Sequence, residues 1–482
     1  MATTEMRQSR WMAAMGMAAP LPSAAVWARL PPGPPGLPIA GSAPAYVRDP
    51  IGYVTRCLET YGRAFSMAWF GYPLVWLVGP DGNRLALSEQ PQKLLWRPAL
   101  ASLVPLLGEG LLVTDGAQHD RLRRLVLPVF QRQRMDGYLP IMWDHAVRYA
   151  ARWRPGQLID VDLAMRRLTL QIAGRTLFGV ELGREHGTLI RAFRDALVYS
   201  DVQWPYSLLR INLPFMPWGR FVRARARLDR FVYGLIRERT SVDSPHYGGA
   251  GGAVPGAGGA PDDALAALLG ARDEDGTRLS PVQVRDQVVQ LLAAGHDTTA
   301  HGLAWTLYLL SQHPAALERV LAEQSAVLSG QPPTFDSLHQ LTYLEMVVKE
   351  ALRLYPPAWA GGRLTAEDIA FQGYRIPPGT FVMYSQWLSH RLPDVFPEPE
   401  AFRPERFDPE HGDPLPPFAY VPFGGGARLC LGMTFALQEL KVVLSALLAR
   451  WRFALEPGQR IVPRPLVTLS PRAGIRMRVQ AA

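Results

Sequence analysis

The sequence predicts a mainly α-helical fold with small β-sheets, built around one long central helix. Apolar residues recur at helical spacing along most of the 482 residues, whereas alternating β-type patterns are confined to short stretches such as 65–78 and 369–382. With 48% hydrophobic residues, the chain can bury a large core without disulfides or oligomerisation. No self-similar repeat of about 20 to 50 residues is visible, which excludes a solenoid or a propeller.

The first 40 residues predict a flexible, Pro-rich lead to a folded body at 41–482. Basic Arg7 and Arg10 precede an Ala/Met-rich stretch that resembles a weak signal sequence, but prolines interrupt it. The apolar run is too short to cross a bilayer as a helix, so we expect no transmembrane anchor. Peripheral contact with a membrane stays open.

A Gly/Ala/Pro-rich stretch at 244–262 has no hydrophobic period and predicts a flexible surface loop. Helical patterns continue on both sides of it, and the motifs described below occur before and after it and need each other. We therefore expect a single domain with an internal loop.

Composition also indicates the cellular compartment and limits the classes of partner. The two cysteines, Cys57 and Cys430, lie far apart in different contexts, which favours a reducing compartment, the cytoplasm, over a disulfide framework. Lys and Arg outnumber Asp and Glu by 51 to 42, but the arginines are spread without a nucleic-acid-binding module. We expect no nucleic-acid partner, and an acidic protein partner stays open.

The central helix is predicted to begin after Ser280 and to end near Gln312. Ser280 and Gln283 form a capping-box pattern around Pro281, and apolar residues then recur at helical spacing. At a rise of about 1.5 Å per residue, the helix would be roughly 45 to 50 Å long and cross the whole domain.

The middle of this helix, residues 294–299, reads Ala-Gly-His-Asp-Thr-Thr. A helix-weakening glycine and hydrogen-bonding side chains are unusual inside an apolar helix and indicate function. The alternative is that Asp297 and the threonines face solvent, and this segment alone does not decide between the two.

A second unusual segment, 423–432, reads Phe-Gly-Gly-Gly-Ala-Arg-Leu-Cys-Leu-Gly. Its glycines allow a tight backbone path before a lone cysteine, Cys430, that is predicted to open an apolar helix. Amides at a helix N-terminus lower a thiol pKa, so Cys430 would be a thiolate fit to bind a soft or borderline metal such as haem iron. The alternative is a buried structural cysteine, as most lone cysteines are.

The same segment resembles the cysteine-loop signature of the cytochromes P-450, Phe-x-x-Gly-x-Arg-x-Cys-x-Gly, at every defined position. The matching residues are Phe423, Gly426, Arg428, Cys430 and Gly432. The resemblance implies the cytochrome P-450 fold, with its long helix crossing a noncovalent haem b, and Cys430 as the axial iron ligand. It also implies a haem-thiolate monooxygenase that uses O2 to hydroxylate or epoxidise a lipophilic substrate.

Two further motifs of the family occur in the expected order. Residues 294–299 resemble its oxygen-binding segment, in which Thr298 would hold a hydrogen-bonded network and Asp297 would link that network to solvent as a proton source. Glu350 and Arg353 match its Glu-x-x-Arg pair, and Arg406 resembles the arginine that completes the triad. We predict a buried, bidentate network that fixes the loop before Cys430, rather than an exposed pair worth a few tenths of a kcal/mol. Thr342 and Glu345 predict a capping box for this helix.

The resemblance also suggests where the haem and the substrate would be held. The haem propionates need cationic or hydrogen-bonding partners, and the cofactor set expected is His119, Arg123, Arg363, Phe423, Gly424, Arg428 and Cys430. Apolar residues expected to face the space above the haem are Leu112, Ala294, Ala358 and Trp359. The proline-interrupted apolar stretch 204–218 predicts either a substrate lid or ordinary packing. A bulky lipophilic substrate is favoured: a fatty acid, a terpenoid or a carotenoid.

No flavin or iron–sulfur motif is visible, so electrons are expected from a ferredoxin or flavodoxin with its reductase, and ultimately from NAD(P)H. Two other functions stay open. One is a haem-thiolate enzyme that uses peroxide or isomerises a peroxide substrate, and the other is a noncatalytic haem-binding protein. Asp297 with Thr298 argues against both, because neither needs an activating network.

Overall fold

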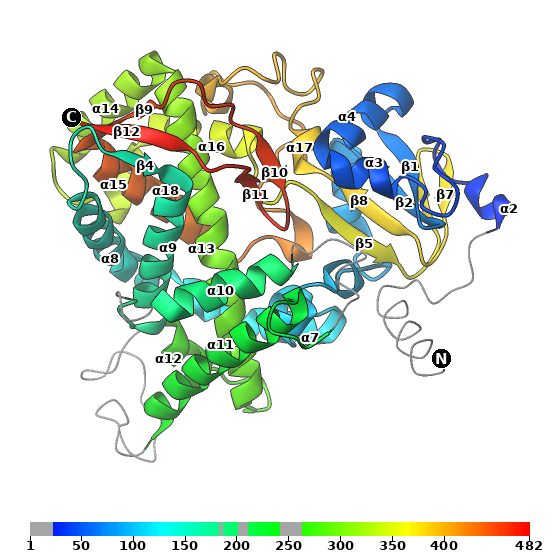
Figure 1. Cartoon of the computed structure of the whole chain (residues 1–482), viewed down its shortest axis with the longest axis horizontal. Coiled ribbons are helices and arrows are strands. Elements are labelled where there is room, and N and C mark those ends of the chain that lie inside the picture. The colour runs from blue at the N-terminus through cyan, green and yellow to red at the C-terminus, as the bar shows by residue number, and fades with distance from the viewer. Residues whose placement is uncertain (1–22, 183–186, 201–210, 242–262) are drawn as a thin grey trace.

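We describe a computed structural model of the chain, which places residues 23–182, 187–200, 211–241 and 263–482. The long helix α13 (Pro281–Gln312) runs through the middle of the molecule, as predicted (Figure 1). Its capping box is also confirmed: Gln283 N donates to Ser280 Oγ at 3.2 Å, and Ser280 N donates to Gln283 Oε1 at 2.9 Å. The predicted loop 244–262 lies outside the described residues.

Large helices pack on α13 or on its neighbours. They are α8 (Arg132–Ala150), α9 (Val161–Phe178), α10 (Gly187–Ser200), α11 (Pro217–Thr240), α14 (Pro314–Leu328), α16 (Thr342–Leu354) and α18 (Met433–Leu448). Shorter helices lie around them: α2 (Ala24–Trp27), α3 (Ala43–Arg48), α4 (Pro50–Tyr61), α5 (Pro80–Arg84), α6 (Val104–Leu107), α7 (Gly116–Val126), α12 (Ala264–Gly270), α15 (Phe335–Gln340) and α17 (Gln386–Ser389). In the described part of the chain, no helix combines the length and apolarity needed to cross a membrane.

The main sheet has five strands in the order β1-β2-β8-β5-β3 and lies to one side of the helices (Figure 1). Its strands are β1 (Ala64–Trp69), β2 (Tyr72–Leu77), β3 (Leu94–Leu95), β5 (Gly361–Thr365) and β8 (Phe381–Tyr384). Smaller sheets pair β4 (Leu158–Asp160) and β9 (Trp451–Leu455) with β12 (Arg476–Ala481), β6 (Ile369–Phe371) with β7 (Tyr374–Ile376), and β10 (Pro463–Pro465) with β11 (Leu469–Pro471). The first stretch predicted to form strands, 65–78, overlaps β1 and β2. The second, 369–382, overlaps β6, β7 and β8.

The core follows this division into helices and sheet. The largest apolar cluster surrounds α13, with Leu303 and Trp305 fully buried, and a separate cluster around Phe65 and Trp76 lies beside the main sheet. Part of the predicted N-terminal lead also belongs to the packed body. Leu30 is buried, and the Pro32 carbonyl accepts a hydrogen bond from Ser66 N in β1 at 2.9 Å.

Candidate functional site

The loop that carries Cys430 is a tight turn closed by its own backbone. Cys430 N donates to the Phe423 carbonyl at 3.0 Å, and Gly426 has φ +59°. A Cβ at Gly426 would lie 2.3 Å from the Leu87 carbonyl oxygen, so only glycine fits there. The turn presents the Cys430 side chain at an accessible surface, whereas Cys57 is buried in the core.

The surroundings of the thiol differ from the prediction in two respects. Helix α18 begins at Met433, so Cys430 precedes the helix instead of opening it. Although the Cys430 residue is exposed, desolvation by the protein atoms around its sulfur raises the pKa of the thiol, and the Gly432 N–H and the Arg123 guanidinium oppose this effect. The predicted low pKa is therefore wrong for the thiol alone. A metal that binds the sulfur would have to displace the proton.

The predicted cationic side chains gather next to this turn. Arg123 Nη1 donates to the Leu429 carbonyl at 2.9 Å, and Arg428 Nη2 donates to Asp115 Oδ1 at 2.8 Å. The guanidinium of Arg363 lies 3.5 Å above the Trp96 ring, and that of Arg428 lies 5.2 Å from it. Trp96 and Asp115 were not predicted, because nothing in their sequence neighbourhood marks them.

Burial lowers the pKa values of two members of this cluster, His119 and Arg363. Burial lowers the pKa of His119, and Arg428 and Arg123 lower it further while Asp120 opposes them. Burial also lowers the pKa of Arg363. Arg363 Nη2 is buried and has no hydrogen-bond partner among the described residues. A buried cationic donor of this kind needs an anion or another acceptor.

The unusual segment of α13 has one accessible side and one buried side. Ala294 is exposed and Thr298 half-buried, and Thr298 Oγ1 donates to the Ala294 carbonyl at 2.7 Å. Asp297 is buried, with Arg166 Nη1 at 3.4 Å from Oδ1, and it accepts a hydrogen bond from Thr468 Oγ1 at 2.7 Å. Although burial opposes ionisation, His301, Arg166 and His296 hold the pKa of Asp297 at about 2. Asp297 is thus an ionised member of a buried network, and its role as the proton source that links the Thr298 network to solvent stays a prediction.

Glu350, Arg353 and Arg406 form the buried network that was predicted. Arg353 binds Glu350 through two parallel hydrogen bonds of 2.7 and 2.8 Å, and Arg406 Nε lies 3.4 Å from Glu350 Oε1. All three side chains are fully buried. The capping box predicted at Thr342 and Glu345 is wrong: Glu323 accepts the first N–H groups of α16 instead, while Glu345 pairs with Lys349 and Lys441.

His390 connects the triad to the Cys430 loop and was not predicted. Its carbonyl accepts from Arg353 Nη1, its ring Nε2 accepts from Val421 N, both at 2.9 Å, and the Val421 carbonyl accepts from Gly424 N at 3.1 Å. Burial, Arg353 and Arg391 lower the pKa of His390 to about 3, which keeps Nε2 free to accept.

This lowered pKa predicts a loss of stability in acid. The unfolded state binds a proton on His390 below pH of about 6.5, whereas the folded state does so only near 3. The free energy of unfolding should therefore fall as pH drops through this window. Urea unfolding at pH 7 and pH 5 should show a smaller fall in His390→Asn than in the unchanged protein, and equal falls would contradict this.

Polar side chains on α13 hold the loop that carries Leu112. Glu109 N donates to Asp286 Oδ2 at 2.8 Å, and Leu112 N donates to Gln290 Oε1 at 2.6 Å. A Cβ at Gly110 would meet Gln290 Oε1 at 2.5 Å, so the glycine permits this close approach. The predicted pocket residue Leu112 is thereby fixed against the central helix.

Gln290→Leu should loosen this loop. The substitution leaves the Leu112 N–H without its acceptor, which should cost about 1 to 3 kcal/mol of stability. Hydrogen exchange at the amides of residues 109–112 should become faster, with Gln312→Leu at the exposed end of α13 as the control. Unchanged exchange would show that the Gln290 bond does not hold the loop.

The remaining predicted pocket residues do not share one environment. Ala294 and Ala358 are exposed, but Trp359 is buried in the cluster beside the main sheet, where Nε1 donates to the Leu466 carbonyl at 2.9 Å. The Trp359 ring is therefore core rather than an accessible wall. Of the predicted lid 204–218, only residues 211–218 are described, and Phe215 is 75% exposed.

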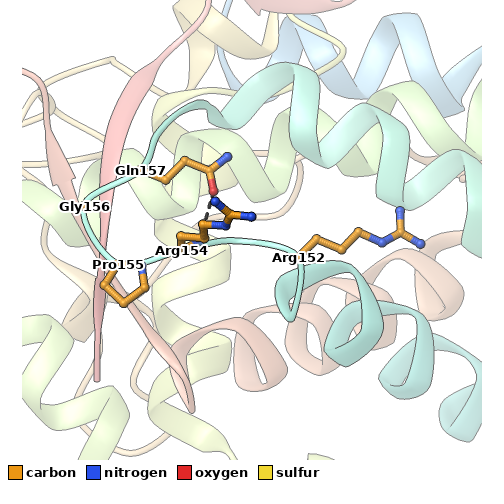
Figure 2. Close-up of a pocket in the computed structure, with 5 residues that line it drawn as sticks. All are labelled: Arg152, Arg154, Pro155, Gly156 and Gln157. Atoms are coloured by element: carbon orange, nitrogen blue, oxygen red, sulfur yellow. Dashed lines mark hydrogen bonds between the residues drawn. The ribbon is translucent and has the colours of Figure 1, made fainter.

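A separate pocket lies on the turn between α8 and β4, lined by Arg152, Arg154, Pro155, Gly156 and Gln157 (Figure 2). Arg154 N donates to Gln157 Oε1 at 3.0 Å and so closes the turn on itself. None of the predicted site residues lines this pocket.

Comparison with known proteins decides the family. The family model described as Cytochrome P450 matches residues 31–475. The chain belongs to the cytochrome P450 family. It is 33% identical to cyclooctatin synthase of Streptomyces melanosporofaciens over 91% of this chain and 93% of that protein, and 33% identical to pentalenene oxygenase of Streptomyces avermitilis over 78% and 80%. The solved structure of retinoic acid-bound cyanobacterial CYP120A1 superposes with a TM-score of 0.82 and 31% identity, over 94% of this chain and 99% of that one.

Membership of the cytochrome P450 family confirms the predicted fold and the class of enzyme, a haem-thiolate monooxygenase. The family uses haem and O2, a lipophilic substrate and a redox partner. The residues fit a haem: an exposed cysteine stands beside a cationic cluster in which the buried Nη2 of Arg363 has no hydrogen-bond partner among the described residues. Haem propionates are anions that such donors bind well.

Proposed function

We propose that Cys430 binds the iron of haem b and that the enzyme oxygenates an isoprenoid hydrocarbon skeleton. The observation that carries the proposal is the exposed Cys430 residue on a tight turn beside Arg123, Arg363 and Arg428. When bound, the haem supplies the chemistry that activates O2. The chain holds the propionates with these arginines and with His119, and Phe423 and Gly424 shape the turn.

Residues on the other side of the site would position the substrate. Ala294, Ala358 and Leu112 give it an apolar surface. The hydroxyl of half-buried Thr298 forms hydrogen bonds at the place where a proton would be delivered to the bound oxygen. Pentalenene and retinoic acid, named for two of the similar proteins, are both isoprenoids. This chemistry favours a terpenoid or carotenoid-like substrate over a fatty acid.

Turnover assays with a panel of lipophilic compounds test the substrate class. Haem-loaded protein, NADPH, a surrogate ferredoxin and its reductase should convert pentalenene or a related cyclic terpene to a product one oxygen atom heavier, with palmitic acid as the comparison. Preferential oxidation of palmitic acid would contradict the isoprenoid proposal.

We expect an acidic ferredoxin or flavodoxin to dock on this protein through attraction between opposite charges. The turnover rate should then fall as the salt concentration increases, because salt screens such attraction.

A further inference from the structure

Two neighbouring side chains beside the Cys430 turn each have a buried N–H group without a partner. The atoms are Trp96 Nε1 and Arg363 Nη2, and neither forms a hydrogen bond with the described residues. The Arg363 guanidinium lies 3.5 Å from the centre of the Trp96 ring, so the two side chains are stacked. An unpaired buried donor destabilises a folded protein, so two such donors in contact indicate that one acceptor serves both.

The main sheet and one carboxylate hold these donors in place. Strand β3 pairs with β5, so Trp96, which follows β3, comes opposite Arg363 in β5. The backbone N–H of Trp96 donates to Asp115 Oδ1 at 3.0 Å. Arg363 Nη1 donates to the Gly362 carbonyl at 2.8 Å, and the Tyr384 ring centre lies 5.1 Å from the guanidinium. The Trp96 indole and the Arg363 guanidinium therefore form a defined pair.

We propose that Trp96 Nε1 and Arg363 Nη2 donate hydrogen bonds to the same haem propionate. The two oxygens of a carboxylate accept several hydrogen bonds, so one propionate can satisfy both N–H groups. Trp96 is then a haem-binding residue that the expected cofactor set does not contain. The inference rests on the proposed function, because a propionate reaches this cluster only if haem binds there.

The charges around the pair favour an anion over a neutral acceptor. Arg428 forms an ion pair with Asp115 at 2.8 Å, whereas Arg123 and Arg363 form no ion pair with the described acids. Another acid of this region, Asp120, is 63% exposed to water, which weakens its influence on buried groups. Two arginines therefore lack a counter-charge beside the Trp96 indole. Carboxylates such as the haem propionates would supply it.

Two other roles for Trp96 can be separated from this one by substitution. Trp96→Phe keeps an aromatic face for Arg363 but removes the N–H donor, so a ring that serves only for stacking is largely retained. A water molecule that accepts from both N–H groups would make the propionates insensitive to the substitution. The matched control is Trp387→Phe in α17, whose ring also lies 3.5 Å from a guanidinium, that of Arg391.

Resonance Raman spectra of the haem-loaded ferric protein test the proposed hydrogen bond without turnover. The propionate-bending bands depend on the hydrogen bonds that the propionates accept. We expect these bands to shift to lower frequency in Trp96→Phe and to keep their position in Trp387→Phe. Bands at an unchanged position in Trp96→Phe would overturn the proposal and leave Trp96 with stacking or a water contact.

Haem release measures how much the hydrogen bond contributes to binding. Ferric protein mixed with excess apomyoglobin transfers its haem at the rate of haem dissociation. Transfer should be about 10-fold faster from Trp96→Phe than from the unchanged protein, as expected for loss of a hydrogen bond to a charged group. Trp96→His, which restores a ring N–H, should recover part of the difference, and Trp387→Phe should release haem at the unchanged rate. Equal rates for Trp96→Phe and the unchanged protein would contradict the proposal.

The carbon monoxide complex of each protein is recorded first. If the unchanged protein lacks the thiolate-type spectrum, the proposed function fails and the role of Trp96 with it. If every protein shows that spectrum, while the Raman bands and the release rate of Trp96→Phe equal those of the unchanged protein, the role of Trp96 alone fails.

Discussion

Glu350→Ala should leave little folded, haem-loaded protein. Glu350 is fully buried and compensates both Arg353 and Arg406, and its Oε1 also accepts a hydrogen bond from Arg403 N at 2.9 Å. Removing the carboxylate leaves the buried Arg353 guanidinium without its counter-charge and leaves Arg406 with Asp413 alone, and breaking a buried ion pair in this way costs about 3 to 5 kcal/mol. This is a large share of the roughly 5 to 15 kcal/mol by which proteins of ordinary stability stay folded.

Urea unfolding of the purified variant and the haem content per chain would measure this effect. The control is Glu400→Ala, which removes a 72% exposed partner of Arg391 and should cost less than about 1 kcal/mol. Equal stabilities for Glu350→Ala and Glu400→Ala would contradict a structural role for the triad.

Thr298→Ala should separate oxygen consumption from product formation. The Thr298 hydroxyl reaches the accessible side of α13, so its loss removes a hydrogen-bonding group beside the place where dioxygen would be activated. A positioned proton-transfer group contributes about 100-fold or more to a rate, so product per NADPH should fall at least ~10-fold while peroxide rises.

Thr299→Ala is the matched control, because Thr299 is buried and its hydroxyl donates to the Gly295 carbonyl at 3.0 Å within the helix. It should keep most of the coupling. Unaltered coupling in Thr298→Ala would contradict the role proposed for this hydroxyl.

Local patterns predicted the elements that local rules determine. The capping residues Ser280 and Gln283 marked the start of α13, and the alternating stretches marked β1 and β2 and the region of β6, β7 and β8, but not β3 or β5. Motif spacing also selected the Glu350–Arg353 pair, whose buried geometry is confirmed. These predictions succeeded because each depends on residues close in sequence, while Cys430 as the iron ligand stays a prediction.

What the sequence did not predict depends on contacts between distant segments. Glu323 replaces the expected Thr342 cap because α14 packs against the start of α16, and the Trp359 ring is buried because the β10–β11 turn supplies a carbonyl for its indole. Asp297 lies against Arg166 and His301, and nothing in the sequence around Arg166 on α9 marks this contact.

The most direct test of thiolate ligation is the absorption spectrum of the dithionite-reduced protein with and without carbon monoxide. It should be recorded for the unchanged protein, Cys430→Ser and the core control Cys57→Ser. We predict a strongly red-shifted Soret band in the unchanged protein and in Cys57→Ser, and its loss in Cys430→Ser. A band that persists in Cys430→Ser, or its absence from haem-saturated unchanged protein, would contradict Cys430 as the iron ligand.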